Sequence, residues 1–185
     1  MRELLRQAIH LVFGLGIAAI VLVLDKSTAI AILAGGLLFG VILIDLVLRG
    51  CSLPVISWLL SFVDRADPLP GKGALFFGVS ALACTVFFPI SVVVPALVAL
   101  SVLDSITTLV GRQYGRHRIY NGKSWEGTLA GITITAIALL PFLSVPVSLL
   151  AALVAGIIEL ASPVDDNLLI PVLVCLVLTL VPGLA

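Results

Sequence analysis

The segment from residue 111 to residue 127, GRQYGRHRIYNGKSWEG, has the residue types needed to bind a chain of phosphates. It holds four of the ten Lys and Arg residues of the chain, together with four glycines. The cations are Arg112, Arg116, Arg118 and Lys123, and the glycines are Gly111, Gly115, Gly122 and Gly127. Cations form strong hydrogen bonds to anionic oxygens, and glycine lets a backbone approach a ligand closely. A solvated loop that only fixes membrane topology is the alternative, and Gly111 with Gly115 also has the spacing of a helix-packing pair.

Carboxylates in apolar surroundings form the second chemical group. Asp45, Asp104 and Glu159 lie within or at the ends of apolar runs, and Asp165, Asp166 and Asn167 follow one of them. An acid at bilayer depth costs about 2.5 to 3.5 kcal/mol, so it needs a partner, a cavity or a proton. Because Mg²⁺ binds carboxylates together with substrate phosphates, we expect a magnesium site. Its candidate ligands are Asp104, Glu159, Asp165, Asp166 and Asn167.

Each of these residues also has a structural interpretation. Asp104 could form a helix–helix hydrogen bond or pair with Arg112. Asp166 or Asn167 could be the N-cap of the last helix. Glu126 could favour the start of a helix through the macrodipole, or contact a metal or nucleotide. A histidine such as His10, at the end of a span, is often structural.

Two polar stripes connect these residues to helices. One follows 3/4 spacing through Ser101, Asp104, Ser105, Thr108 and Gly111, and the other through Glu3, Gln7, His10 and Gly14. Residues at this spacing share one helical face. We therefore expect both faces to turn inward, away from lipid.

The composition predicts an all-α, polytopic transmembrane helical bundle. The 185 residues are 61% hydrophobic and 11% charged, with a mean hydropathy of +1.30. Runs of about 20 apolar residues suffice to cross a bilayer. We predict about seven spans in one integral membrane domain covering residues 1–185, at 8–24, 28–48, 73–90, 92–110, 128–143, 146–160 and 168–184. The apolar stretch 53–63 is too short to span, and we expect it to lie in the interface or to re-enter the membrane.

The distribution of Lys and Arg predicts the orientation. Nine of the ten lie on one side of a seven-span arrangement, and only Lys26 lies on the other. By the positive-inside rule, the N-terminus and the basic loop are cytoplasmic and the C-terminus is outside. We expect a multi-pass protein of the cell membrane, with the lipid bilayer as its partner and no nucleic acid. The three cysteines have no metal or disulfide spacing.

Four blocks of this sequence resemble the family of polyprenol and dolichol kinases, phytol kinase and CTP-dependent diacylglycerol kinase. The blocks are RELLRQAIHLVFG at 2–14, LPGKGALFF at 69–77, DSITTLVGRQYGRHRIYNGKSWEGTLAG at 104–131 and ELASPVDDNLLIP at 159–171. The third block is the most specific. No Walker A motif, GxGxxG or protein-kinase motif is present.

The resemblance implies a CTP-dependent lipid kinase that uses Mg²⁺. CTP would donate a phosphoryl group to the hydroxyl of a dolichol-like isoprenoid alcohol or a diacyl- or dialkylglycerol. The catalytic candidates are Asp104, Lys123, Glu126 and Asp166. CTP would bind Arg112, Gly115, Arg116, Arg118, Gly122, Lys123 and Ser124. The lipid alcohol would contact His10 and Lys72.

Two other functions remain open from the sequence. The KSWEG stretch is similar to a block of phosphatidate cytidylyltransferases, which would form a CDP-lipid. A small ion-coupled transporter could instead use Asp45, Asp104 and Glu159 as an ion path. Transport requires polar residues through the whole membrane depth, whereas the outer halves of the predicted spans are almost wholly apolar.

Overall fold

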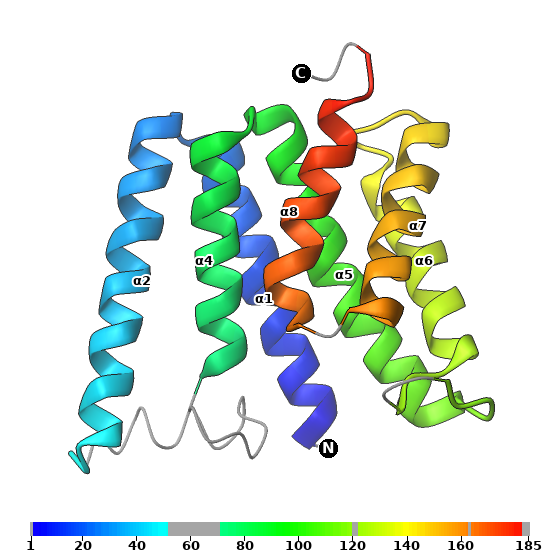
Figure 1. Ribbon diagram of the computed structural model, residues 1–185, viewed down its shortest axis with the longest axis horizontal. Coiled ribbons are helices and arrows are strands. Elements are labelled where there is room, and N and C mark those ends of the chain that lie inside the picture. Colours follow the sequence, from blue (N-terminus) through cyan, green and yellow to red (C-terminus); the bar gives the residue numbers. More distant parts are fainter. Residues whose placement is uncertain (1, 52–70, 120–121, 163, 183–185) are drawn as a thin grey trace.

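The computed structural model describes residues 2–51, 71–119, 122–162 and 164–182, and within them the chain is an all-helical bundle (Figure 1). The helices are α1 (Arg2–Val23), α2 (Lys26–Leu48), α4 (Lys72–Phe87), α5 (Ile90–Tyr114), α6 (Trp125–Leu139), α7 (Val145–Ala161) and α8 (Asp166–Thr179). The described residues contain no β-strand, and their one isolated bridge joins Arg118 and Ser124. The predicted fold class is therefore confirmed at the level of an all-α bundle.

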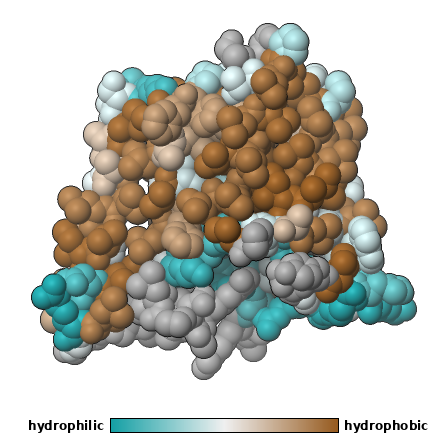
Figure 2. All heavy atoms as spheres, in the orientation of Figure 1, coloured by the Kyte–Doolittle hydropathy of each residue, from teal (hydrophilic) through white to brown (hydrophobic). Residues whose placement is uncertain are grey.

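Three helices, α1, α2 and α5, are long and apolar enough to cross a membrane. The apolar helices α4, α6, α7 and α8 are shorter, with 14 to 17 residues each. Apolar side chains cover most of the face seen in Figure 2, and hydrophilic ones gather toward its lower edge. These features indicate a membrane protein. The predicted stretch 53–63 lies outside the described residues.

Helix α5 is the centre of the bundle. Every residue from Val92 to Leu103 is buried, and α5 packs most extensively against α6 and α1. Helix α2 is the opposite case, because it lies at one side of the bundle with most of its surface exposed. An apolar helix with most of its surface exposed is compatible with a lipid environment.

Two helix boundaries differ from the predicted spans in a way that affects the site. Helix α1 begins at Arg2 and α5 continues to Tyr114, because a helix can extend past its apolar segment where polar side chains face solvent. Arg112 consequently lies in the last turn of α5. The basic loop is shorter than predicted and connects Gly115 to Ser124.

The two predicted polar stripes face each other across the contact between α1 and α5. A Cβ atom on Gly14 would overlap Ser101, so the helices approach closely at this level. Nearer the start of α1, the His10 Nε2 atom lies 3.4 Å from an Asp104 carboxylate oxygen. The Ser105 hydroxyl donates to the carbonyl of Gln7 at 3.4 Å. The expectation that both faces turn inward is confirmed, and each stripe is the partner of the other.

Candidate functional site

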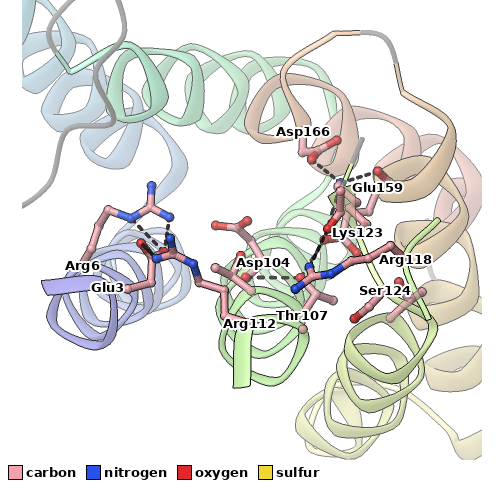
Figure 3. A pocket seen from close by; sticks show the side chains of 14 residues that line it. Glu3, Arg6, Asp104, Thr107, Arg112, Arg118, Lys123, Ser124, Glu159 and Asp166 are labelled. Atoms are coloured by element: carbon pink, nitrogen blue, oxygen red, sulfur yellow. Dashed lines mark hydrogen bonds and ion pairs between the residues drawn. The ribbon is translucent and has the colours of Figure 1, made fainter. Parts of the chain in front are cut away.

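A polar pocket of about 390 Å³ opens at the end of the bundle where α1 begins and α5 ends (Figure 3). Its lining comes from α1, α5, α6, α7, α8 and the loop before α6. The sequence-predicted residues that line it are Asp104, Gly111, Arg112, Arg118, Gly122, Lys123, Ser124, Glu159 and Asp166. Residues far apart in the chain thus meet in one cavity of the size that ligand sites have.

Four carboxylates line the pocket, and three of them, those of Asp104, Glu159 and Asp166, lie away from the α1 residue Glu3. Glu159 is the most enclosed, with 4% of its surface exposed. One of its carboxylate oxygens, Oε1, accepts a hydrogen bond from the Thr107 hydroxyl at 2.6 Å. The other, Oε2, is buried and has no hydrogen-bond partner among the described residues. A buried oxygen of this kind is costly unless a ligand satisfies it.

Lys123 reaches from the loop into this acidic cluster. Its ammonium donates to Asp166 Oδ2 at 2.7 Å, lies 3.6 Å from Glu159 Oε1, and also bonds the Glu159 carbonyl oxygen. The backbone conformation on either side of Lys123 directs its side chain toward the acidic residues. Gly122 has a φ of 72°, which a residue with a side chain rarely adopts. Ser124 then caps α6 by accepting a hydrogen bond from the Gly127 amide at 3.2 Å.

Two arginines, Arg6 and Arg112, form the side of the pocket opposite Lys123, whereas Arg118 lies beside Lys123 (Figure 3). Glu3 bridges the first two, because one carboxylate oxygen pairs with Arg6 and the other lies 2.5 Å from Arg112 Nη1. Arg118 donates to the carbonyl of Gly122 at 2.8 Å and so closes the turn before Lys123. In Figure 3, Asp104 lies between the pair formed by Arg6 and Arg112 and the cluster around Lys123.

The donor set fits a hard divalent cation that binds together with phosphates. Carboxylate, carbonyl and hydroxyl oxygens are the ligands that Mg²⁺ takes, and Mg²⁺ usually needs only one or two carboxylates besides the phosphates. The Glu159 Oε2 atom, which has no hydrogen-bond partner among the described residues, is one more oxygen available to bind a metal ion. The described residues hold no cluster of three or more His, Cys, Asp or Glu arranged around one metal position. The Lys123 ammonium lies between the carboxylates of Glu159 and Asp166.

Comparison with known proteins gives one relative. The uncharacterized protein MJ1137 of Methanocaldococcus jannaschii is 34% identical to this chain over 183 residues, which cover 96% of this chain and 93% of the relative. This chain belongs to the same family. No protein-family profile matches the chain, and no solved structure matches it. Since the relative is itself uncharacterized, the chemistry of this family has to be argued from the pocket.

Several predicted site residues of this family member lie outside the pocket lining. Glu126 lies in the first turn of α6, and its carboxylate lies 2.7 Å from His117 Nδ1, turned toward the loop. Arg116 is exposed in the same loop. Gly115 serves packing, because a Cβ atom there would overlap Gly111 and Ser124.

The predicted acidic group after α7 divides into two parts. Asp166 faces the pocket, whereas Asp165 is the N-cap of α8 and accepts from the backbone and side-chain nitrogens of Asn167. The structural alternative that Asp166 or Asn167 is the N-cap is therefore excluded. Asp165 also lies 3.9 Å from Lys72, so the predicted substrate residue Lys72 is placed beside α8 and outside the lining. His10 is likewise outside the pocket lining, and its Nε2 atom lies 3.4 Å from an Asp104 carboxylate oxygen.

Five lining residues were not among the predicted site residues. They are Glu3, Arg6, Thr107, Thr108 and Thr128. Thr108 and Glu3 were part of the predicted stripes, and Thr107 follows Asp104 by three residues, which places both on neighbouring positions of one helix face. Arg6 had only its charge as a signal. Asp45, which the transporter alternative places in an ion path, pairs with Arg49 at 2.7 Å on the exposed surface of α2.

Proposed function

We propose that this protein is a CTP-dependent lipid kinase. It transfers the γ-phosphoryl group of CTP to the hydroxyl of a membrane lipid alcohol, either a dolichol-like isoprenoid alcohol or a diacyl- or dialkylglycerol. The observation that carries the proposal is the pocket itself, in which arginines, Lys123 and three carboxylates meet at the end of an apolar bundle. A phosphate chain and a lipid hydroxyl can reach one another at such a place.

Phosphoryl transfer depends mainly on positioning and electrostatic stabilisation, and the pocket residues match these tasks. Arg6, Arg112 and Arg118 are available to bind phosphate oxygens. Asp104, Asp166 and Glu159 would hold Mg²⁺, which neutralises charge on the phosphates when it is bound. Among the candidate acceptors of the hydroxyl proton, Asp104 and Asp166 line the pocket and Glu126 does not.

The proposal includes a topology. All seven described helices would cross the membrane, with the start of α1 and the basic loop in the cytoplasm and the end of α8 outside. Two observations support it. Successive helices alternate in direction in Figure 1, and the start of α1 and the basic loop lie at the same end of the bundle. CTP is a cytoplasmic metabolite, so the pocket has to open on that side.

The test is incubation of the purified protein with labelled CTP, Mg²⁺ and a panel of lipid alcohols. The proposal requires CDP and a lipid monophosphate, with CTP supporting turnover far better than ATP at equal concentration. Pyrophosphate and a CDP-lipid, formed from a lipid phosphate, would instead establish a cytidylyltransferase, the reaction that the similarity of the KSWEG stretch raises. Absence of turnover with every alcohol, together with ion flux in vesicles, would favour the transporter alternative.

A further inference from the structure

Lys123 is surrounded by oxygen atoms in the way that a bound metal cation is. Its ammonium has Asp166 Oδ2 at 2.7 Å, Glu159 Oε1 at 3.6 Å and the Glu159 carbonyl oxygen as a direct hydrogen-bond acceptor. These are two carboxylates and one carbonyl from α7 and α8, reached by a side chain from a separate loop. Ca²⁺, Mn²⁺ and Mg²⁺ prefer the same kinds of oxygen.

A second observation is that Lys123 leaves one carboxylate oxygen of this group without a hydrogen bond. Glu159 is 4% exposed, and its Oε2 atom is buried without a hydrogen-bond partner among the described residues. An ammonium group has three hydrogens to donate, and the three oxygens near it here are Asp166 Oδ2, Glu159 Oε1 and the Glu159 carbonyl oxygen. A divalent ion carries more charge and accepts more ligands than an ammonium, so it could use this remaining oxygen.

We propose that Lys123 is the resident cation of a divalent-metal site formed by Glu159 and Asp166, and that the metal enters when an anionic ligand draws the ammonium away. The identity of that ligand, the triphosphate of CTP, rests on the proposed function. The metal site itself does not depend on it. In the ligand-free protein the lysine offsets part of the negative charge of the buried Glu159 and the half-buried Asp166. In the complex the Lys123 ammonium binds phosphate oxygens, and the metal ion takes its place between Glu159 and Asp166.

The arginine side of the pocket is arranged in the complementary way. Glu3 neutralises Arg6 and Arg112 in the ligand-free protein, at the place where phosphates would take over the arginines. The charged side chains on both sides of the pocket thus form ion pairs with other residues of the protein. Arg112 is 63% exposed, and exposed ion pairs are weak, so the pair between Arg112 and Glu3 can open without a large cost.

The experiment measures Mn²⁺ binding to the purified full-length protein without nucleotide, from the loss of the free Mn²⁺ signal in electron paramagnetic resonance. Wild-type protein should bind Mn²⁺ weakly. Lys123→Met, which removes the competing charge but keeps a chain of similar length, should bind one Mn²⁺ at least roughly tenfold more tightly. Lys123→Met combined with Asp166→Asn should lose this gain, because a ligand of the metal is gone.

If Lys123→Met fails to fold, Lys123→Gln replaces it, since its amide still donates hydrogen bonds but carries no charge. Thermal unfolding with and without Mn²⁺ provides a second readout, because a ligand that binds only the folded state raises the midpoint. Equal Mn²⁺ affinities of folded wild type and both single variants would overturn the proposal.

A CTP analogue that cannot release its γ-phosphate separates this inference from the proposed function. With the analogue present, wild-type protein should bind Mn²⁺ as tightly as Lys123→Met does alone. If the variants gain Mn²⁺ but the analogue has no effect on wild type, the metal site stands and CTP is not its ligand. If CTP turnover is observed but neither variant gains Mn²⁺, the kinase stands and the inference about Lys123 fails.

Discussion

At the scale of single residues, the pocket is defined by charges that come from separate parts of the chain. Lys123 is the clearest case, because it comes from the loop before α6 and contacts Glu159 on α7 and Asp166 on α8. Asp104 is the second, since it lies between the arginines and the acidic cluster. Both residues are predicted to be essential for turnover.

We expect Lys123→Ala to lower kcat and kcat/KM together by about 10²- to 10³-fold, the usual effect of removing a preorganised electrostatic contact to the transition state. Arg116→Ala is the matched control, because Arg116 is a cation of the same loop that lies outside the pocket lining. Its loss should be roughly threefold or less, since solvent screens an exposed charge. Steady-state rates of both purified variants decide the point. Equal effects would mean that the loop acts only through its total charge.

We expect Asp104→Asn to lose at least as much activity as Lys123→Ala, with partial recovery at high Mg²⁺. The substitution keeps the size of the side chain and removes a negative ligand, which weakens metal binding. The Mg²⁺ dependence of the rate is the measurement. A well-folded Asp104→Asn protein with normal turnover would remove Asp104 from the site.

His10 is expected to act through Asp104, because its Nε2 atom lies 3.4 Å from that carboxylate and its ring is held edge-on against buried Phe77. His10→Leu should lower kcat about tenfold and raise the Mg²⁺ concentration for half-maximal activity, as losses of groups that orient metal ligands do. His10→Gln keeps a donor at similar reach and should retain most of the activity. If both variants lose stability and leave the Mg²⁺ dependence unchanged, His10 serves packing alone.

At the scale of elements, the contact between α5 and α6 holds the basic loop in place. The two helices flank the loop, and they approach each other through glycine. A Cβ atom on Gly127 would lie 2.6 Å from the carbonyl oxygen of Thr107 and 2.9 Å from the Cα atom of Gly111. Both of those positions belong to the turn of α5 that follows Asp104. Any displacement of α6 would therefore move the pocket lining.

Gly127→Ala is expected to destabilise the protein by about 1 to 3 kcal/mol, because backbone atoms cannot move aside as a flexible side chain can. Gly16→Ala in α1 is the control, since no atom lies within 4 Å of a Cβ at that position. The control should be neutral or slightly more stable, given the low helix propensity of glycine. Thermal unfolding in detergent measures both. A Gly127→Ala protein as stable as the control would show that α6 can shift without cost.

At the scale of the whole molecule, charge and hydropathy are arranged along one axis. The pocket and the basic loop lie at the end of the bundle where α1 begins, and Lys26 lies at the start of α2, at the other end. Its ammonium donates to the carbonyl of Phe88 at 3.0 Å, which joins two helix connections at that end. A charged pocket at one end of an apolar bundle is the arrangement expected for an enzyme that works at a membrane surface.

The topology can be tested by labelling single cysteines in cells. A cysteine at Gln113 should react only with reagents on the cytoplasmic side, and one at Ser27 only with reagents outside. Both positions are exposed. The background requires Cys51→Ser, because Cys51 is exposed whereas Cys84 and Cys175 are buried. Labelling of both positions from one side would contradict the proposed seven-span arrangement.

The sequence by itself determined the features that depend on local spacing. Apolar composition predicted a helical bundle, and 3/4 spacing predicted the inward faces of α1 and α5 that the structure confirms. The sequence also indicated which charged residues supply the pocket, namely cations of the basic loop and the acids Asp104, Glu159 and Asp166. These predictions succeed because helical periodicity and the apolar character of a segment are properties of neighbouring residues.

Only the tertiary structure decided which of these groups meet. Glu3 and Arg112 are 109 residues apart in the chain, and Lys123 and Asp166 are 43 apart. Asp165 and Asp166 are adjacent and identical in type, yet one caps α8 and the other lines the pocket. A polar stripe predicts that a face turns inward but not which helix it meets, because that partner is set by the packing of all the helices around α5. The position of Lys123 between the acids likewise follows from where the turn at Gly122 places its side chain relative to α7 and α8, and no local pattern encodes that distance.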